Sequence, residues 1–417
     1  MIEIGKYSLG VGDRFSHQGE AQLKAILKAQ EKLGVQIEPV WNKSNREHNI
    51  VHTEPVDVRA EAEGAVRALE YKGRYFVDAD HINLTNVDRF IIHSDFFTLD
   101  VADYIGRRAA DTDLAGFVAN HKSFCRSLVI PGIKHPFNVT EQYLEDFAAK
   151  FLYAINEAAA IYKHIAATKG EGKFITEVSM DEVDQPQKPL DMLFILKCLA
   201  DLKVPVQTIA PKFTGRFNKG VDYQGDITQF SKEFEEDLLV IDYAVREFGL
   251  PANLKLSVHS GSDKFSIYPV MASLIKKYNK GIHIKTAGTT WLEEVIGLSV
   301  SGEKGLKIAK TIYRKAYERK DELCKPYASV IDIDEKQLPS PDEVERWTDI
   351  KYSETLRHIP GNKSYNPGFR QLIHVGYKVA SEMGKEYFDA LKENKAVIAG
   401  CVTENLYDRH IMRLFGK

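Results

Sequence analysis

The stretch LKLSVHSGSDKFS, residues 254–266, passes from a strand-like pattern to the start of a helix-like one. Apolar and polar residues alternate up to Val258, which is typical of a strand. The strand then ends in His259, and small residues lead to Asp263 and Lys264. A segment with helical spacing follows. The stretch predicts a strand–helix unit whose strand ends in ionisable side chains; an ordinary turn is the alternative, and the rest of the chain decides between them.

The same unit repeats along the chain, because apolar segments alternate with segments of helical spacing. This alternation favours a parallel sheet covered by helices. We expect an α/β fold, a closed (β/α)₈ TIM-type barrel, with a doubly wound open sheet as the alternative. The expected strands are 6–12, 35–41, 74–82, 173–182, 204–213, 254–263 and 281–288.

A closed barrel of this type needs one further strand, its fourth along the chain. We expect it between residues 90 and 130, with SLVIPG (127–132) as the candidate segment. The residues from 87 to 105 are expected to be helical. A long helix is expected from Thr140, a good N-cap, to Ala167.

After residue 323, the alternation of strand-like and helix-like segments gives way to a segment interrupted by prolines. We predict a barrel domain over 1–323, followed over 324–417 by a proline-rich connection and a C-terminal helical extension that caps the barrel. A helix of this extension should begin with Asn366 as N-cap and Pro367 at its first position. The prolines that interrupt the connection are Pro326, Pro339, Pro341, Pro360 and Pro367.

The composition excludes several classes of protein. The 417-residue chain is 44% hydrophobic and 28% charged, with a formal net charge of -3, which is typical of a soluble globular protein. No basic run suggests a nucleic-acid partner, and no apolar run is long enough to span a membrane. The four cysteines form no CxxC pair, and the N-terminus has no secretory pattern. We expect a cytoplasmic protein with reduced thiols.

Polar and ionisable side chains follow most of the expected strands. The carboxyl ends of parallel strands meet at one mouth of a barrel, so these side chains should converge there. Such a mouth suits a polyhydroxylated or anionic small molecule. The residues are Asp13, Arg14, Asn42, Lys43, Ser44, Arg46, Asp78, Asp80, His81, Glu177, Asp181, Glu182, His259, Asp263, Lys264, Lys285, Thr286 and Thr289.

His81, Glu177 and His259 are the candidate metal ligands. Imidazole and carboxylate groups suit a divalent cation such as Zn²⁺, Mn²⁺, Ni²⁺ or Co²⁺. Neither of these two histidines belongs to an HxH or HxxxH pair, and either one taken alone is more often a hydrogen-bonded core or loop residue. Their joint placement at three strand ends predicts a metal site.

Four basic residues at or near the expected mouth have more than one interpretation. Lys285 could form a Schiff base, act as a general base or hold an anion. Arg14 could clamp a carboxylate, or it could form a structural ion pair with Asp13 or another acid. Arg370 and His374 share one helix face and could reach the mouth, or that face could be solvated.

Seven segments together resemble the tagaturonate/fructuronate epimerase family. The resemblance covers nearly the whole chain. It implies a metal-dependent (β/α)₈ barrel that inverts C4 of a ketohexuronate or of a related ketohexose. The segments are GVGDRF (10–15), DADH (78–81), EVSMDE (177–182), GVDYQGD (220–226), LSVHSGSDKFS (256–266), IHIKTAGTTWLE (282–293) and RQLIHVGYK (370–378).

The position of C4 limits the chemistry that can invert it. C4 of a 2-ketose is β to the carbonyl, so its hydrogen is not acidic. Two routes to inversion remain. One is retro-aldol cleavage followed by re-addition, and the other is oxidation at C4 followed by re-reduction, which needs a nicotinamide. The fingerprint GxGxxG is absent, so we favour retro-aldol chemistry. The expected catalytic residues are Asp80, Glu177 and Lys285, and the expected substrate contacts are Arg14, Ser44, Asp181, Lys264, Thr286 and Arg370.

Three other functions remain open from the sequence. An aldolase or a ketose 3-epimerase could use the same scaffold, and a sugar-acid binding protein would need no turnover. In each case the expected partner is a small sugar or sugar acid, with no nucleic acid and no membrane. The sequence does not indicate an oligomeric state.

Overall fold

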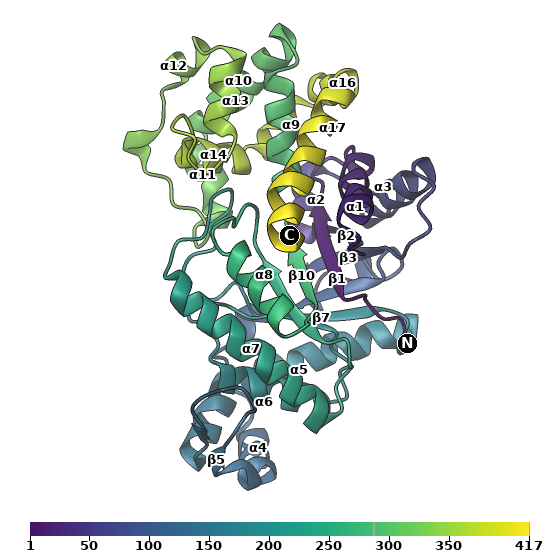
Figure 1. The fold of residues 1–417 in the computed structure, drawn as a ribbon, viewed down its shortest axis with the longest axis vertical. Helices are drawn as coiled ribbons and strands as arrows, with labels where there is room; N and C mark the ends of the chain where they lie inside the picture. The colour runs from purple at the N-terminus through teal and green to yellow at the C-terminus, as the bar shows by residue number, and fades with distance from the viewer. Residues whose placement is uncertain (287, 417) are drawn as a thin grey trace.

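The computed structural model describes residues 1–286 and 288–416, so Ala287 of the segment KTAGTT and the last residue lie outside the described chain. Its strands close into a barrel in the order β1-β10-β9-β8-β7-β4-β3-β2, in the middle of the molecule (Figure 1). Every neighbouring pair in this barrel is parallel. The predicted TIM-type barrel is confirmed, and the open-sheet alternative is wrong.

The barrel strands are almost entirely buried, because side chains fill the barrel on one face and helices cover the other. This double burial explains the nearly continuous apolar runs in the sequence. The strands are β1 Tyr7–Gly12, β2 Glu38–Ser44, β3 Phe76–Ile82, β4 Phe96–Asp100, β7 Ile175–Ser179, β8 Thr208–Ala210, β9 Lys255–His259 and β10 Ile282–Lys285.

The fourth strand of the barrel is β4, and the prediction that SLVIPG forms it is wrong. β4 pairs with β3 and β7, where Phe96 stands beside Ile175. SLVIPG instead contributes β5 Ser127–Leu128, which pairs antiparallel with β6 Phe137–Asn138 in a separate two-stranded sheet. The expected helix over 87–105 is also wrong, because this range holds β4 between two 3₁₀ turns. The sequence FFTLD is too short to show a period of its own.

Helices surround the barrel and supply most of the apolar core. The long helix α5 begins after Thr140, whose hydroxyl accepts a hydrogen bond from the Tyr143 N–H at 3.0 Å, as the sequence predicts. Helix α4 lies with β5 at one end of the molecule (Figure 1). The helices are α1 Gly19–Leu33, α2 Asn45–Val51, α3 Pro55–Ala68, α4 Asp111–His121, α5 Glu141–Lys169, α6 Pro189–Asp201, α7 Ile227–Phe248, α8 Tyr268–Lys277 and α9 Thr289–Ser299.

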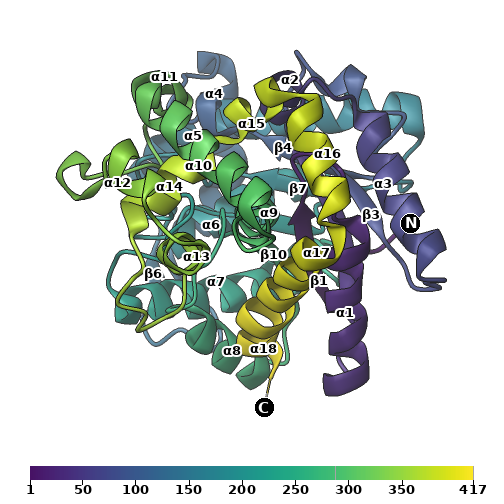
Figure 2. The same cartoon turned by 90° about the horizontal axis from the view of Figure 1, so that it is seen from above.

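Most of the remaining helices gather at the opposite end of the molecule, whereas the last one, α18, lies beside α8 (Figure 1). In the view from above, α9, α16 and α17 lie over the barrel strands (Figure 2). Asn366 caps α14 by accepting from the Phe369 N–H at 2.8 Å, as predicted. Helix α11 runs across the predicted domain boundary at residue 323. These helices are α10 Glu303–Glu318, α11 Lys320–Cys324, α12 Pro341–Glu345, α13 Asp349–Leu356, α14 Pro367–Val375, α15 Tyr377–Met383, α16 Lys385–Glu393, α17 Lys395–Glu404 and α18 Met412–Phe415.

Short helical turns complete the C-terminal part. The 3₁₀ turns η4 Lys325–Tyr327 and η5 Glu335–Gln337 lie in the proline-rich connection, and a π-helical segment, Asn405–Ile411, joins α17 to α18. Within the described residues, no helix combines the length and the apolar character that crossing a bilayer requires.

Candidate active site

A pocket rimmed by charged side chains lies at the carboxyl ends of the barrel strands. Its walls come from the ends of β1, β2, β3, β7, β9 and β10, from the loop after β8 and from the proline-rich connection. The structure thus brings together seven of the predicted site residues: Arg14, Ser44, Asp80, His81, Asp181, His259 and Lys285. The complete lining adds Arg46, Glu47, Glu182, Lys219, Gly261 and Tyr327.

The end of β3 turns two consecutive side chains toward this pocket. Neighbouring residues in a regular strand point to opposite faces, yet Asp80 and His81 both line the pocket. The pairing register of β3 with β4 shifts between Ala79 and Ile82, and His81 has a φ of 53°. A non-glycine residue in this left-handed region is uncommon and is often found at functional sites. The irregular backbone is what places both side chains at the mouth.

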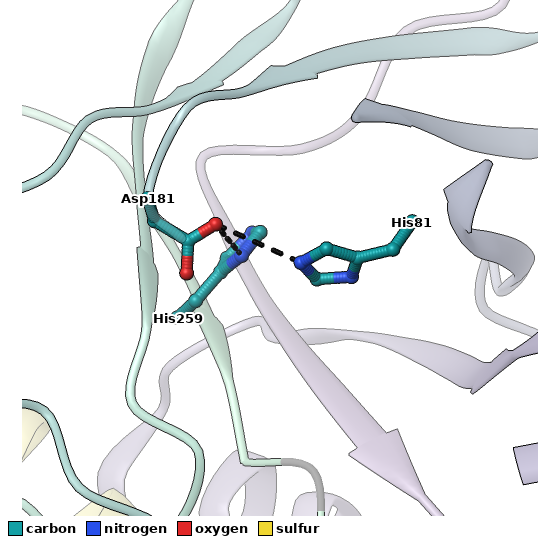
Figure 3. Close-up of side chains that lie close together, drawn as sticks. All are labelled: His81, Asp181 and His259. Atoms are coloured by element: carbon teal, nitrogen blue, oxygen red, sulfur yellow. Dashed lines mark ion pairs between the residues drawn. The ribbon is translucent and has the colours of Figure 1, made fainter. Parts of the chain in front are cut away.

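His81, Asp181 and His259 form a group that could hold a metal ion. One potential ligand atom from each lies within 4.8 Å of the others. Asp181 Oδ1 lies 3.1 Å from His259 Nδ1 and 3.6 Å from His81 Nε2, and Figure 3 shows both imidazoles turned toward this carboxylate. These two ring nitrogens are buried and have no hydrogen-bond partner among the described residues.

Two further carboxylates bind the opposite nitrogens of the same histidines. Asp80 Oδ1 lies 2.9 Å from His81 Nδ1, and Glu177 Oε1 lies 2.8 Å from His259 Nε2. A carboxylate only accepts, so each of these nitrogens donates, and in the neutral imidazole the nitrogen that faces Asp181 then carries the lone pair. Metal-binding histidines are oriented in the same way. The donor set therefore fits a divalent cation.

The third member of this group is Asp181, where the sequence predicts Glu177. Glu177 lies within β7 and is fully buried, so its carboxylate reaches His259 from inside the barrel. Asp181 follows the end of β7 and reaches the same imidazole from the mouth. Burial alone would lower the pKa of His259, but the charges of Asp181 and Glu177 raise it to about 9. Asp181 and Glu177 thus stabilise a positive charge at the position of the His259 ring.

Lys285 is buried beneath the pocket among three carboxylates. Its Nζ lies 2.8 Å from Asp78, 2.8 Å from Asp80 and 2.9 Å from Glu177, and it also donates to the Thr98 hydroxyl. Burial alone would lower the pKa of the amine, but these charges raise it well above its ordinary value. A protonated amine is no nucleophile, so the geometry favours a fixed cation over the Schiff-base reading.

Arg14 lines the pocket but already has a carboxylate partner. It forms a buried ion pair with Glu47, and its guanidinium stacks over the ring of Tyr377 at 4.6 Å. The structural ion pair that the sequence left open is therefore present, and its acid is Glu47 rather than Asp13. Asp13 instead accepts four backbone N–H groups of residues 15–18, at 2.6 to 3.0 Å, and so holds the loop that carries Arg14.

Three of the predicted substrate contacts lie outside the pocket lining. Lys264 is fully buried and donates to the carbonyls of Asn218 at 2.9 Å and Val221 at 2.7 Å. Thr286 donates to the Gly10 carbonyl at 2.9 Å. Arg370 is also fully buried, so its helix face is packed against the protein rather than solvated. These side chains fix the surroundings of the pocket.

Asp263 connects the loop after β9 to the C-terminal part of the chain. It accepts from Arg370 at 2.6 Å, and its other oxygen lies 3.1 Å from His410 Nε2. His358 Nδ1 lies 3.3 Å away. Gly261, with a φ of 64°, permits the turn between His259 and this anchor. The stretch HSGSD is thus more than a turn, because its first residue enters the pocket and its last fixes the loop.

The sequence pattern did not single out several pocket residues. Arg46 and Glu182 are among the side chains that follow expected strands, but the sequence indicates no specific role for either, and it gives Glu47 and Lys219 no special place. Tyr327 lies in the proline-rich connection, far along the chain from any barrel strand. Its position at the mouth depends on how that connection folds, for which the sequence contains no local signal.

The chain is similar to known proteins in both sequence and structure. The family model UxaE, tagaturonate epimerase, matches residues 2–414. A tagaturonate/fructuronate epimerase of Thermotoga maritima is 28% identical over 426 residues, which cover 98% of this chain and 81% of that protein. The native crystal structure of a fructuronate-tagaturonate epimerase from Cohnella laeviribosi has a TM-score of 0.82 and 22% identity, and covers 99% of this chain and 82% of that chain. At this identity the structural match shows the fold.

Proposed function

Because the chain belongs to the tagaturonate epimerase family, it is an epimerase, and we propose that it inverts C4 of a ketohexuronate and so interconverts tagaturonate and fructuronate. The observation that carries this proposal is the match of the family model to residues 2–414 of a barrel whose mouth is lined by charged groups. A ketohexuronate offers hydroxyls, a carbonyl and a carboxylate, and these groups suit such a lining.

The proposal includes a divalent cation held by His81, Asp181 and His259. Support comes from the two unpartnered, buried imidazole nitrogens that face one carboxylate oxygen. Asp80 and Glu177 would fix the tautomers of these histidines. Zn²⁺, Mn²⁺, Ni²⁺ and Co²⁺ all accept such ligands. When bound, the cation would supply Lewis acidity that polarises the C2 carbonyl.

The proposed reaction cleaves and remakes the C3–C4 bond. A base takes the proton of the C4 hydroxyl, the C4–O bond becomes a carbonyl, and the electron pair of the C3–C4 bond moves toward C2 to give an enediolate. The resulting C4 aldehyde turns about the C4–C5 bond and presents its other face. Re-addition forms the C3–C4 bond again and returns the proton to the C4 oxygen, so atoms and electrons balance.

Asp80 is the better placed of the two predicted bases. It lines the pocket, whereas Glu177 does not; each of the two carboxylates also contacts one histidine and Lys285. Lys285 contacts both carboxylates and would keep them charged and in place. We therefore assign proton transfer at the C4 oxygen to Asp80, orientation of His259 to Glu177, and charge balance between them to Lys285.

The test is incubation of the purified protein with tagaturonate and, separately, with fructuronate. Each should convert to the same mixture of the two acids, observed by NMR. A chelator should stop the conversion, and added metal should restore it. A product inverted at C3 would identify a ketose 3-epimerase, and accumulation of three-carbon fragments would identify an aldolase. Absence of any conversion with each of the four metals would overturn the proposal.

A further inference from the structure

Arg46 is the pocket cation that lacks an acidic partner. Arg14 is paired with Glu47, and Lys285 is surrounded by three carboxylates. Lys219 Nζ lies 3.8 Å from a glutamate oxygen. Among the ion pairs of the described residues, none includes Arg46, which is exposed at the mouth. A negatively charged group of a ligand would therefore meet Arg46 without first displacing a carboxylate of the protein.

The guanidinium of Arg46 is held by the proline-rich connection. It lies over the ring of Tyr327 at 4.6 Å, and its Nη1 lies 3.5 Å from the Pro326 carbonyl. The hydroxyls of Tyr327 and Tyr377 are 2.6 Å apart, and Tyr377 supports Arg14 in the same way. Arg14 and Arg46 thus each stack on one tyrosine of a hydrogen-bonded pair. Stacking uses the face of a guanidinium and leaves N–H donors at its edge available.

We propose that Arg46 binds the carboxylate of the sugar acid and makes the site prefer a ketohexuronate over the neutral ketohexose. This inference rests on the proposed function and names the group that sets its substrate class. A planar guanidinium can bind a carboxylate through two parallel hydrogen bonds. Tyr327 is a positioning residue in this arrangement, since it orients the guanidinium from below and comes from the connection rather than from the barrel.

The experiment compares one acid with its neutral counterpart. Specificity constants for tagaturonate and tagatose are measured for the wild type and for Arg46→Gln, which removes the charge at an exposed position. The ratio of kcat/KM for the acid to that for the neutral sugar should fall about 10- to 100-fold, mostly through KM, since hydrogen bonds to charged groups have this strength. Arg46→Lys keeps the charge without the fork and should give an intermediate ratio.

Two controls separate this role from a structural one. Arg107→Gln is the matched variant, because Arg107 is an arginine that stacks on Tyr104 at 4.9 Å and donates to a backbone carbonyl away from the pocket. Its ratio should equal that of the wild type. Lys219→Gln tests the other pocket cation with a weak acidic partner, since its amine lies 3.8 Å from a glutamate oxygen. An unchanged ratio in Arg46→Gln, or a larger fall in Lys219→Gln than in Arg46→Gln, would overturn the inference.

Calorimetric titration separates this inference from the proposed function. The wild type should bind tagaturonate more tightly than tagatose, and Arg46→Gln should lose that difference, whether or not turnover occurs. A wild type that converts neither sugar would refute the proposed epimerase while the titration still decides the role of Arg46. Equal binding of acid and neutral sugar by the wild type would refute the carboxylate subsite.

Discussion

Glu177 Oε1 accepts a hydrogen bond from His259 Nε2 at 2.8 Å, while the other nitrogen of that imidazole faces Asp181 at 3.1 Å. The histidine is therefore held between a carboxylate inside the barrel and one at its mouth. The inner carboxylate is fully buried, so its charge is felt strongly by the ring. This geometry differs from the sequence prediction, which names Glu177 as a metal ligand and Asp181 as a substrate contact.

Replacing Glu177 with Gln should weaken metal binding without removing a ligand. The amide oxygen can still accept from His259, but the charge that raises the basicity of the ring is lost. We expect metal affinity to fall about 10- to 100-fold and kcat to fall by orders of magnitude. Asp181→Asn should have the larger effect on affinity, because it changes a ligand. Elemental analysis and activity during metal titration measure both effects.

The matched control is Glu233→Gln, which changes a carboxylate that binds Thr214 outside the pocket lining. Its metal content and activity should equal those of the wild type. If Glu177→Gln bound metal less well than Asp181→Asn, Glu177 would be the ligand, as the sequence predicts.

Replacing Arg370 with Met should destabilise the fold. The side chain is fully buried and lies 2.6 Å from the equally buried Asp263. Its loss leaves a buried carboxylate with only histidine partners, which costs about 3–5 kcal/mol in the free energy of unfolding. Lys385→Met breaks an exposed ion pair with Asp389 and should change that energy by less than about 1 kcal/mol. Urea unfolding measures both; equal effects would show that Asp263 does not depend on Arg370.

The Asp263 carboxylate should also make the free energy of unfolding depend on pH. Burial alone would raise the pKa of Asp263, but Arg370 and the two histidines hold it well below its ordinary value of about 4. A carboxyl with a lowered pKa stabilises the fold above its unfolded pKa and ceases to do so as the pH falls toward the folded one. His410, whose pKa burial lowers, adds to the loss below about pH 6.5, because the unfolded chain takes up its proton first.

We therefore expect the free energy of unfolding to fall as the pH is lowered from 7 to 3. Arg370→Met should show a smaller fall below pH 5, since the pKa of Asp263 is no longer held down. Urea midpoints across this pH range measure the difference. Parallel curves for the two proteins would contradict the assigned cause.

The sequence predicted the barrel well where strands were long and helices followed them. It failed at β4, because the five residues FFTLD show neither a clear alternation nor a helical period, and the apolar segment SLVIPG looked equally suitable. Packing against β3 and β7 decides between these segments, and no local pattern records that packing.

The site was predictable in position but not in detail. Strand ends correctly placed His81 and His259 at one mouth, yet alternation alone would turn His81 away from Asp80. The positive φ of His81 that brings them together cannot be read from DADH. Sequence order also does not give depth within the barrel, so the sequence predicts Glu177 as the ligand, whereas Asp181 is the carboxylate that both imidazoles face from the mouth. The position of Tyr327 depends on contacts with residues far away in the chain.

The retro-aldol route makes a prediction about hydrogen exchange. C4 keeps its hydrogen as an aldehyde hydrogen throughout cleavage and re-addition. The C4-inverted product formed in D₂O should therefore contain no deuterium at C4, and added NAD should not stimulate the reaction. NMR of the product measures the label. Deuterium at C4 would rule out the simple cleavage route, and deuterium at C3 with inversion there would indicate enolisation instead.

Arg46 should also retain the cleaved fragment. Cleavage of the C3–C4 bond leaves the carboxylate on the same three-carbon piece as the C4 aldehyde, and that piece must turn before it re-adds. A guanidinium that holds the carboxylate lets the aldehyde turn about the C4–C5 bond without leaving the pocket. Arg46→Gln should therefore release more three-carbon fragments per inversion than the wild type, while Arg107→Gln should not. Quantitative NMR of fragments and epimer gives this ratio; an unchanged ratio in Arg46→Gln would show that the fragment is retained by other contacts.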